Sequence, residues 1–196
     1  MKRAPDLRRA AKAIEDLLDA LDIPKNDPEL RGTPARVAET LAHDLLSGYG
    51  TDPAEVLAEA TASRAPGLVV LADVAAVTVC PHHLLPAVGV VHLGYLPGEK
   101  VAGLGALARL VDCLSRRLVL QEDLGQQIAD ALVAHLGARG AGAIVELSPL
   151  CVTARGERRH GTRAVTTAYA GALATDASAR AELLQAVAIA RRPPAP

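Results

Sequence analysis

The residues with the clearest chemistry are the run Cys80-Pro81-His82-His83 and a lone Cys151 much further along the chain. Cys80 and His83 are one tight turn apart, so both side chains can face one ion, and Cys151 can complete the site from another element. Thiolate and imidazole ligands suit zinc, and three protein ligands leave a fourth position open for water. The run therefore predicts a catalytic zinc site. The alternative is a buried thiol beside a turn that contains histidine.

The two adjacent histidines are not expected to share one role. Neighbouring side chains diverge from the backbone, so His82 and His83 should not bind the same ion. One of them is therefore left beside the water that zinc would activate, which is the place for a general acid or base. Histidine, with an ordinary pKa of about 6.5, changes its protonation state close to neutral pH and suits that task.

The first part of the chain has the apolar spacing of helices. The residues that recur at this spacing in a first helix are Leu7, Ala11, Ile14, Leu18 and Leu21. A second helix is predicted to begin with Thr33 as its N-cap and Pro34 as its first helical residue. A short third helix is predicted after Asp52. We therefore expect an N-terminal helical region over residues 1–66.

The rest of the chain alternates between strand-like and helix-like segments. Strands are predicted at residues 67–79, 87–95, 143–147 and 163–169, and helices at 104–117, 121–136 and 176–190. Two strands, two long consecutive helices and two further strands indicate an α+β fold, with a four-stranded antiparallel sheet that carries helices on one face. A boundary is expected within residues 61–67, so that residues 67–196 form a second region.

Composition and charge narrow the class of protein. The net charge of −1 gives no general attraction to nucleic acid or to anionic membranes, and no apolar run is long enough to span a membrane. The first residues are too acidic and too regularly spaced for a signal peptide, and three cysteines do not suggest a disulfide framework. We therefore expect a protein of the reducing cytoplasm that has no nucleic-acid or membrane partner.

Several further segments of the chain have distinctive sequences; they are 33–38, 79–86, 89–97, 103–111, 115–117, 121–124, 151–156 and 165–167. Together these segments resemble the GTP cyclohydrolase I family. The resemblance covers about residues 30–173 in the family's order. The resemblance implies the tunnelling fold, in which each subunit supplies part of a barrel that closes only when copies assemble. It also implies a homodecamer of two pentameric rings, with active sites between subunits.

The resemblance also implies roles for the metal-ligand residues. Cys80, His83 and Cys151 match the family's three zinc ligands, and His82 matches the histidine that gives a proton to N7 of guanine. The implied reaction is hydrolysis of GTP at C8, which releases formate and gives 7,8-dihydroneopterin triphosphate. This product serves tetrahydrofolate synthesis in the family.

Four further residues match the family's substrate contacts. Gln121 and Glu122 match the pair that reads guanine, where a carboxylate can accept hydrogen bonds from N1 and the 2-amino group. Arg109 and Arg155 match positions that bind the triphosphate. Structural alternatives remain. The helix dipole alone favours an acidic residue in a first turn. Arg109, Asp112 and Arg116 are spaced for ion pairs on a solvated helix face.

Three positions depart from the family's pattern. Gly105 and Ala106 stand where the family has serine and lysine, and Pro149 stands where it has a histidine, two residues before Cys151. Proline can neither transfer a proton nor donate a backbone hydrogen bond. Three interpretations follow. The first is the ordinary reaction, with an arginine of segment 158–163 replacing the lysine. The second is a divergent zinc enzyme that stops at a ring-opened formamidopyrimidine or uses another purine. The third is a non-catalytic binding or scaffold ring.

Overall fold

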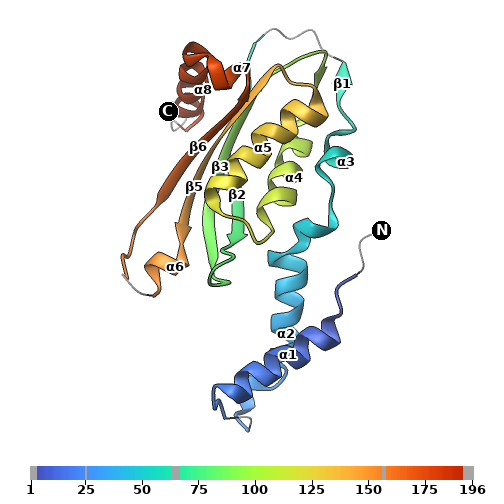
Figure 1. Cartoon of the computed structure of the whole chain (residues 1–196), viewed down its shortest axis with the longest axis vertical. Helices are drawn as coiled ribbons and strands as arrows, with labels where there is room; N and C mark the ends of the chain where they lie inside the picture. The colour runs from blue at the N-terminus through green and yellow to red at the C-terminus, as the bar shows by residue number, and fades with distance from the viewer. Residues whose placement is uncertain (1–3, 25, 63–66, 156–157, 192–196) are drawn as a thin grey trace, which may run out of the picture.

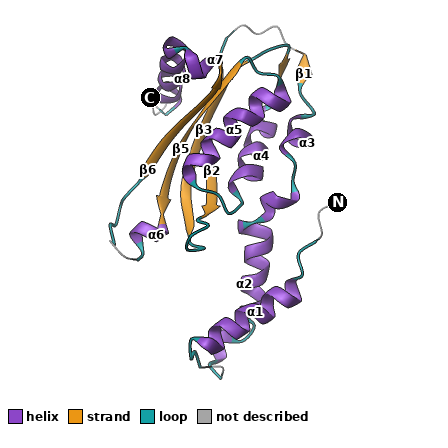
Figure 2. Ribbon diagram, viewed as in Figure 1, coloured by secondary structure: helices purple, strands orange, loops and turns teal. Residues whose placement is uncertain are grey.

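The centre of the computed structural model is an antiparallel sheet of four strands in the order β2-β3-β5-β6 (Figure 1, Figure 2). The structure describes residues 4–24, 26–62, 67–155 and 158–191. The strands are β2 (Val69–Val79), β3 (Pro86–Leu96), β5 (Gly140–Pro149) and β6 (Ala164–Gly171). The prediction of a mixed fold with an antiparallel sheet and several helices is confirmed.

Two helices cover one face of the sheet, and a third lies against part of the other face. These helices are α4 (Leu104–Ser115), α5 (Gln121–Leu136) and α8 (Ala177–Ala190). Along β3, Val91, Leu93 and Tyr95 have no exposed surface and pack in one apolar core with α4 and α5. On β5, Ile144 belongs instead to the core formed with α8. The alternation of side chains along each strand thus separates the two cores.

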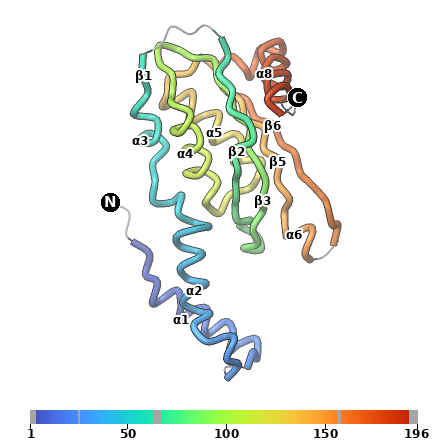
Figure 3. Tube along the Cα trace, turned by 180° about the vertical axis from the view of Figure 1, so that it is seen from behind, coloured from blue at the N-terminus to red at the C-terminus, as the bar shows by residue number. Residues whose placement is uncertain are grey.

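The N-terminal helices form an arm that extends away from the sheet (Figure 3). Its elements are α1 (Leu7–Ala20), η1 (Pro28–Leu30), α2 (Thr33–Glu39), η2 (Thr40–Leu45) and η3 (Ser47–Gly50). The α1 helix packs against α2, and α2 runs on into η2, which is π-helical. Short helix α3 (Pro53–Leu57) then reaches α4, and a second small sheet pairs β1 (Thr61–Ala62) with β4 (Lys100–Val101).

One predicted helix start is wrong. Thr33 is the first residue of α2 and not its N-cap. The cap position is held by Gly32, which has a left-handed backbone with φ of 77° and makes no side-chain capping hydrogen bond. The Thr33 hydroxyl instead accepts a hydrogen bond from Nη2 of Arg36 at 2.8 Å. The left-handed conformation suits glycine, because it has no Cβ.

Two further expectations concern the chain as a whole. The predicted boundary falls largely on residues 63–66, which lie outside the described part of the chain, so the division into two regions stays a prediction. Within the described residues, no helix combines the length and the apolar character needed to cross a bilayer.

Three segments meet at one end of the sheet (Figure 1). The β2–β3 loop, the first turn of α5 and short helix α6 (Leu150–Thr153), which directly follows β5, all lie there. β5 pairs with β3 so that Pro149 lies opposite Ala87. This register carries the residues after β5 to the β2–β3 loop, which contains the run from Cys80 to His83.

Candidate active site

The fold brings together the three predicted metal ligands. The ligand atoms of Cys80, His83 and Cys151 all lie within 4.8 Å of one another, and Sγ of Cys80 is 4.0 Å from Nδ1 of His83. Both cysteines are partly buried and His83 is exposed. No other group of three or more potential ligand residues meets this criterion in the described part of the chain.

The β2–β3 loop is held by its own backbone. The amide of Cys80 donates to the carbonyl of Leu85, and the amide of Leu84 donates to the carbonyl of Cys80, both at 2.9 Å. Leu84 has a left-handed backbone with φ of 54°, which costs about 1–2 kcal/mol for a residue with a Cβ. The Leu84 side chain is 63% exposed, so its burial offsets little of this cost. The turn therefore holds Cys80 and His83 in a strained loop.

The two histidines diverge, as the sequence predicts. The rings of His82 and His83 have centroids 6.2 Å apart and planes at 79°. His83 belongs to the metal-ligand group, whereas His82 lines an adjoining cavity of about 280 Å³. His82, the predicted proton-transfer residue, therefore lies beside the three predicted metal ligands.

The same cavity contains the predicted base-reading pair. Its lining includes Gln121, Glu122, Pro149 and Cys151. Glu122 is exposed in the first turn of α5. Gln121 is partly buried, and its side-chain amide donates to two backbone carbonyls, those of Val145 and Ala164. Glu122 thus presents an exposed carboxylate, while the donor side of Gln121 is already engaged.

The electrostatics of the two thiols fit a cation. Burial raises the pKa of the Cys151 thiol above its ordinary value of 9.0; neighbouring Cys80 raises it further, and Arg155 acts in the opposite direction. Two thiolates close together repel each other, and a divalent cation between them removes that penalty. Sulfur and imidazole donors are those that zinc prefers. The residues present therefore fit a zinc ion.

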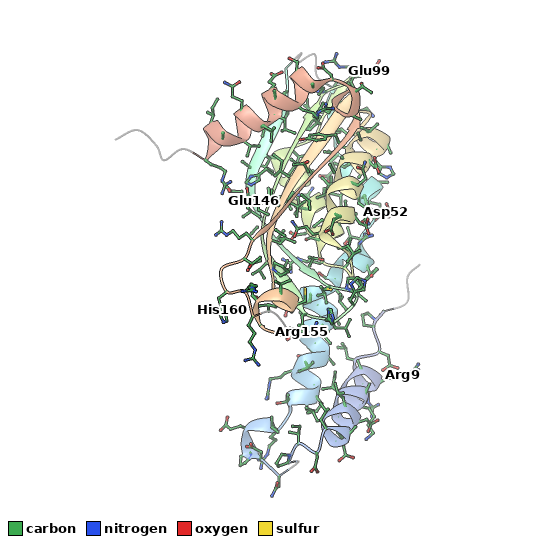
Figure 4. The ribbon with its side chains drawn as sticks, turned by 60° about the vertical axis from the view of Figure 1, so that its left-hand side comes forward. Arg9, Asp52, Glu99, Glu146, Arg155 and His160 are labelled. Carbon is green, nitrogen blue, oxygen red and sulfur yellow. The ribbon has the colours of Figure 1, made fainter. Side chains whose placement is uncertain are left out.

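The two arginines differ in position. Figure 4 places Arg155 with His160 at the α6 end of the sheet, and Arg155 is close enough to act on the Cys151 thiol. Arg109 lines a separate cavity of about 250 Å³. Its Nη2 atom lies 3.5 Å from Oε2 of Glu59 on the exposed surface. Asp112 pairs with Arg116 at 2.9 Å, which is one of the ion pairs that the helical spacing predicts. Within a single chain, Arg109 therefore does not line the cavity that His82 lines.

Comparison with known proteins decides the family. The family model "GTP cyclohydrolase I" matches residues 10–188. The chain is 41% identical over 176 residues to GTP cyclohydrolase 1 of Chromobacterium violaceum, covering 90% of this chain and 85% of that one. It is 42% identical over 184 residues to GTP cyclohydrolase 1 of Mycobacterium leprae (strain TN), covering 93% and 89%. The chain belongs to the GTP cyclohydrolase I family. It is thus a hydrolase of that type.

One solved structure gives a weaker likeness. The apo form of the archaeosine synthase QueF-Like matches with 20% sequence identity and a TM-score of 0.44, covering 55% of this chain and 97% of that one. This likeness is too slight to place the chain further within the GTP cyclohydrolase I family.

The three departures from the family's pattern lie in two places. Pro149 forms part of the cavity wall next to the metal-ligand group. Gly105 and Ala106 lie in the first turn of α4, where Gly105 is exposed and Ala106 is only 7% exposed. Within one chain, Pro149 is therefore the departure that touches this cavity.

The sequence reasoning missed two residues that support the site. The hydroxyl of Thr78, which is 3% exposed, donates to the carbonyl of Val119 at 3.2 Å. The amide of Val79 donates to the carbonyl of Arg117 at 3.2 Å, and Nε of Arg117 donates to the carbonyl of Gly48 at 3.1 Å. These bonds fix the end of β2 just before Cys80. A threonine within a run of apolar strand residues was the signal in the sequence.

Proposed function

We propose that the protein hydrolyses the imidazole ring of GTP at C8 and releases formate, giving 7,8-dihydroneopterin triphosphate. Membership of the GTP cyclohydrolase I family supports this reaction. The observation that carries it is the position of His82 and Glu122 on the cavity that adjoins Cys80, His83 and Cys151. A base held by Glu122 would have its imidazole ring near the metal-ligand group.

In this proposal Cys80, His83 and Cys151 hold a zinc ion. When bound, zinc lowers the pKa of water to about 7 and so supplies a nucleophile near neutral pH. His82 gives a proton to N7 of the base, which makes C8 of the purine easier to attack. Proton transfer of this kind contributes about 10²–10⁴-fold to the rate.

Glu122 selects guanine over adenine. Its carboxylate accepts hydrogen bonds from N1–H and from the 2-amino group, and adenine offers neither in that arrangement. Because Glu122 is exposed at the start of α5, its carboxylate can meet a ligand in the cavity. The helix dipole also favours an acidic side chain at this first-turn position.

Phosphate binding is shared between copies of the chain in this proposal. Arg155 serves the site of its own chain, and Arg109 serves the site of a second copy, because it lies away from its own cavity. β2 and β6 are the outer strands of the sheet, and their outer edges suit the barrel closure of a tunnelling fold. We infer a homodecamer of two pentameric rings. The cytoplasm is its proposed location, since the two thiols must stay reduced there.

A second candidate is a reaction that stops at the ring-opened formamidopyrimidine. Pro149 favours it, because proline in the cavity wall has no proton to transfer. Gly105 and Ala106 provide neither a hydroxyl nor an ammonium group at their positions in α4. The residues proposed for the first hydrolytic step are all present in this chain. The later rearrangement of the ribose has fewer side chains to assist it.

Mass spectrometry of the products from zinc-loaded protein and GTP tests the proposal. 7,8-Dihydroneopterin triphosphate together with formate is the expected result. Detection of a formamidopyrimidine nucleotide instead would contradict the first reaction and support the second candidate. GTP recovered intact, from protein that contains one zinc ion per chain, would contradict both.

A further inference from the structure

The side chain of Gln121 makes an unusual pair of hydrogen bonds. Its Nε2 atom donates to the carbonyl of Val145 and to the carbonyl of Ala164, each at 2.9 Å. A primary amide has two N–H donors, so both are used within the chain. The two carbonyls also decide which end of the amide faces them, since only the nitrogen can donate. The donor side of Gln121 is thus turned toward the sheet.

These bonds join the first residue of α5 to two strands at once. Val145 lies in β5 and Ala164 begins β6, and Ala164 pairs with Leu147 in the ladder between these strands. The hydroxyl of Thr166 on β6 donates back to the carbonyl of Gln121 at 3.5 Å. The helix start is therefore clamped to β5 and β6 through both its side chain and its backbone.

A glycine one turn further on allows this close approach. A Cβ placed on Gly125 would lie 3.3 Å from Cβ of Ala168 and 3.4 Å from Cγ2 of Val145. These distances are tight, so a larger residue would push α5 away from β5 and β6. Gly125 thus lets the first turns of α5 sit close enough to the sheet for Gln121 to reach both carbonyls.

The clamp connects two parts of the candidate site. Glu122 follows Gln121 on α5, and β5 leads through Pro149 directly to Cys151 on α6. A purine has its N1 and 2-amino edge at one end and C8 at the other. The distance from Glu122 to the metal-ligand group must therefore match the length of this ring system, and productive geometry tolerates errors of only about 0.5 Å.

We propose that Gln121 is a positioning residue, which fixes Glu122 relative to Cys151, and that it does not read the base through its amide donors. This inference rests on the proposed function, because it concerns how that site is held. If Gln121 fixes this distance, the site accepts a base with the length of a bicyclic purine. Selectivity for guanine therefore rests on Glu122 and not on the amide donors of Gln121.

The test replaces Gln121 by methionine, which has similar length but no donor. With zinc-loaded Gln121→Met, kcat for GTP should fall about 100-fold, as expected for a displacement of about 1 Å. The preference for GTP over ITP and ATP, measured as kcat/KM ratios, should stay that of the wild type. Glu122→Gln is the contrasting variant, whose preference should fall. Gln127→Met, an exposed residue of the same helix, is the matched control and should change neither value.

A second readout needs no turnover. The visible spectrum of the cobalt-substituted protein reports the geometry of the thiolate ligands, and Gln121→Met should alter it because Cys151 moves with β5. Thr166→Val should alter the cobalt spectrum in the same direction by a smaller amount. This second variant keeps the inference testable if Gln121→Met fails to fold. If Gln121→Met changes the spectrum but the zinc-loaded wild type leaves GTP intact, the positioning role of Gln121 would stand and the proposed function would be rejected. An unchanged spectrum, or a lost preference for GTP with kcat retained, would overturn the inference.

Discussion

The two thiols of the metal-ligand group come from parts of the chain that only the sheet brings together. Cys80 directly follows β2, whereas Cys151 follows β5 in α6. The pKa of Cys151 is raised by burial and by Cys80, so the uncharged thiol is favoured when no cation is present. Metal uptake should therefore release protons and strengthen as the pH rises.

Removal of one thiol should abolish metal retention. Cys151→Ala leaves two ligands, and zinc affinity should fall by more than 100-fold, since loss of an outer hydrogen-bond partner alone costs about 10–100-fold. Metal content after dialysis, measured by inductively coupled plasma mass spectrometry, checks this. Cys113→Ser is the control, because Cys113 is buried away from the group and should leave zinc in place. Equal zinc in Cys151→Ala and the wild type would contradict the ligand assignment.

Tyr95 gives the protein a predictable loss of stability in alkali. Burial raises the pKa of this phenol above its ordinary value of 10.0, although the amide of Ala102, which donates to Oη at 3.0 Å, acts against this shift. The contribution of Tyr95 to the free energy of unfolding is therefore complete below pH 10. It falls as the pH rises above 10, because the phenol ionises more readily in the unfolded chain than in the folded protein.

Tyr95→Phe should therefore flatten the decline of stability above pH 10. It should also cost about 1 kcal/mol at neutral pH through the lost hydrogen bond. Urea unfolding at a series of pH values measures both effects. Tyr169→Phe is the control, because Tyr169 is a partly buried tyrosine of β6. Its free energy of unfolding should depend on pH as that of the wild type does. The same slope in Tyr95→Phe would contradict this account.

At the scale of elements, a buried histidine links three parts of the fold. His92 on β3 has no exposed surface. Its Nδ1 atom accepts a hydrogen bond from the amide of Asp73 at 3.0 Å, so the proton is on Nε2, which lies 3.2 Å from Oε1 of Glu146 on β5. Asp73 has φ of 54° at an irregularity in β2, and Arg191, after α8, reaches Glu146 at 2.8 Å. His92 thus has a structural role, away from the metal-ligand group.

His92→Ala should destabilise the protein without loss of metal. A cavity in the interior and two unpaired polar groups together should lower the free energy of unfolding by about 3 kcal/mol. Chemical denaturation and metal analysis of the same preparation measure both quantities. His135→Ala removes an exposed side chain at the end of α5 and should change stability by less than about 0.5 kcal/mol. Loss of zinc from folded His92→Ala would contradict this role.

The sequence predicts elements better than it predicts their junctions. The α5 helix runs over Gln121–Leu136, as its apolar spacing predicts, because that signal is local. The start of α2 is different, since the hydroxyl of Thr33 bonds to Arg36. The spacing of Cys80 and His83 is also local. The approach of Cys151 depends on the pairing of β3 with β5, which no local pattern reveals.

The same limit applies to Gln121 and Arg109. The resemblance assigns both to substrate contacts, and these roles stay predictions. Gln121 also bonds to strands far away in the sequence. Arg109 lines a different cavity from the one that Glu122 lines. Each outcome depends on how distant elements pack, and the residue type alone is compatible with either role.

At the scale of the whole molecule, the separation of Arg109 from the cavity of its own chain predicts sites shared between copies. Arg109→Ala should lower kcat/KM for GTP about 10- to 100-fold, because a hydrogen bond to a charged group contributes about 1.5–3 kcal/mol. Glu122→Ala should lose guanine selectivity and most activity. When the two variants are refolded together, some sites would combine an intact Glu122 with an intact Arg109 from the other variant.

Mixing should therefore restore part of the activity that both pure variants lack. Size-exclusion chromatography of the mixture should show the same assembly as the wild type. Activity no greater than the sum of the two separate variants, in such a mixed assembly, would show that each chain uses its own Arg109 or none.

The most direct measurement is the fate of the C8 carbon. GTP labelled at C8 is incubated with zinc-loaded wild-type protein and with Cys151→Ala. We expect the wild type to release labelled formate in proportion to the GTP consumed, and Cys151→Ala to release none. Label held in a formyl group on an opened ring would select the second candidate. Label that remains in intact GTP with the zinc-loaded wild type would contradict the proposed function.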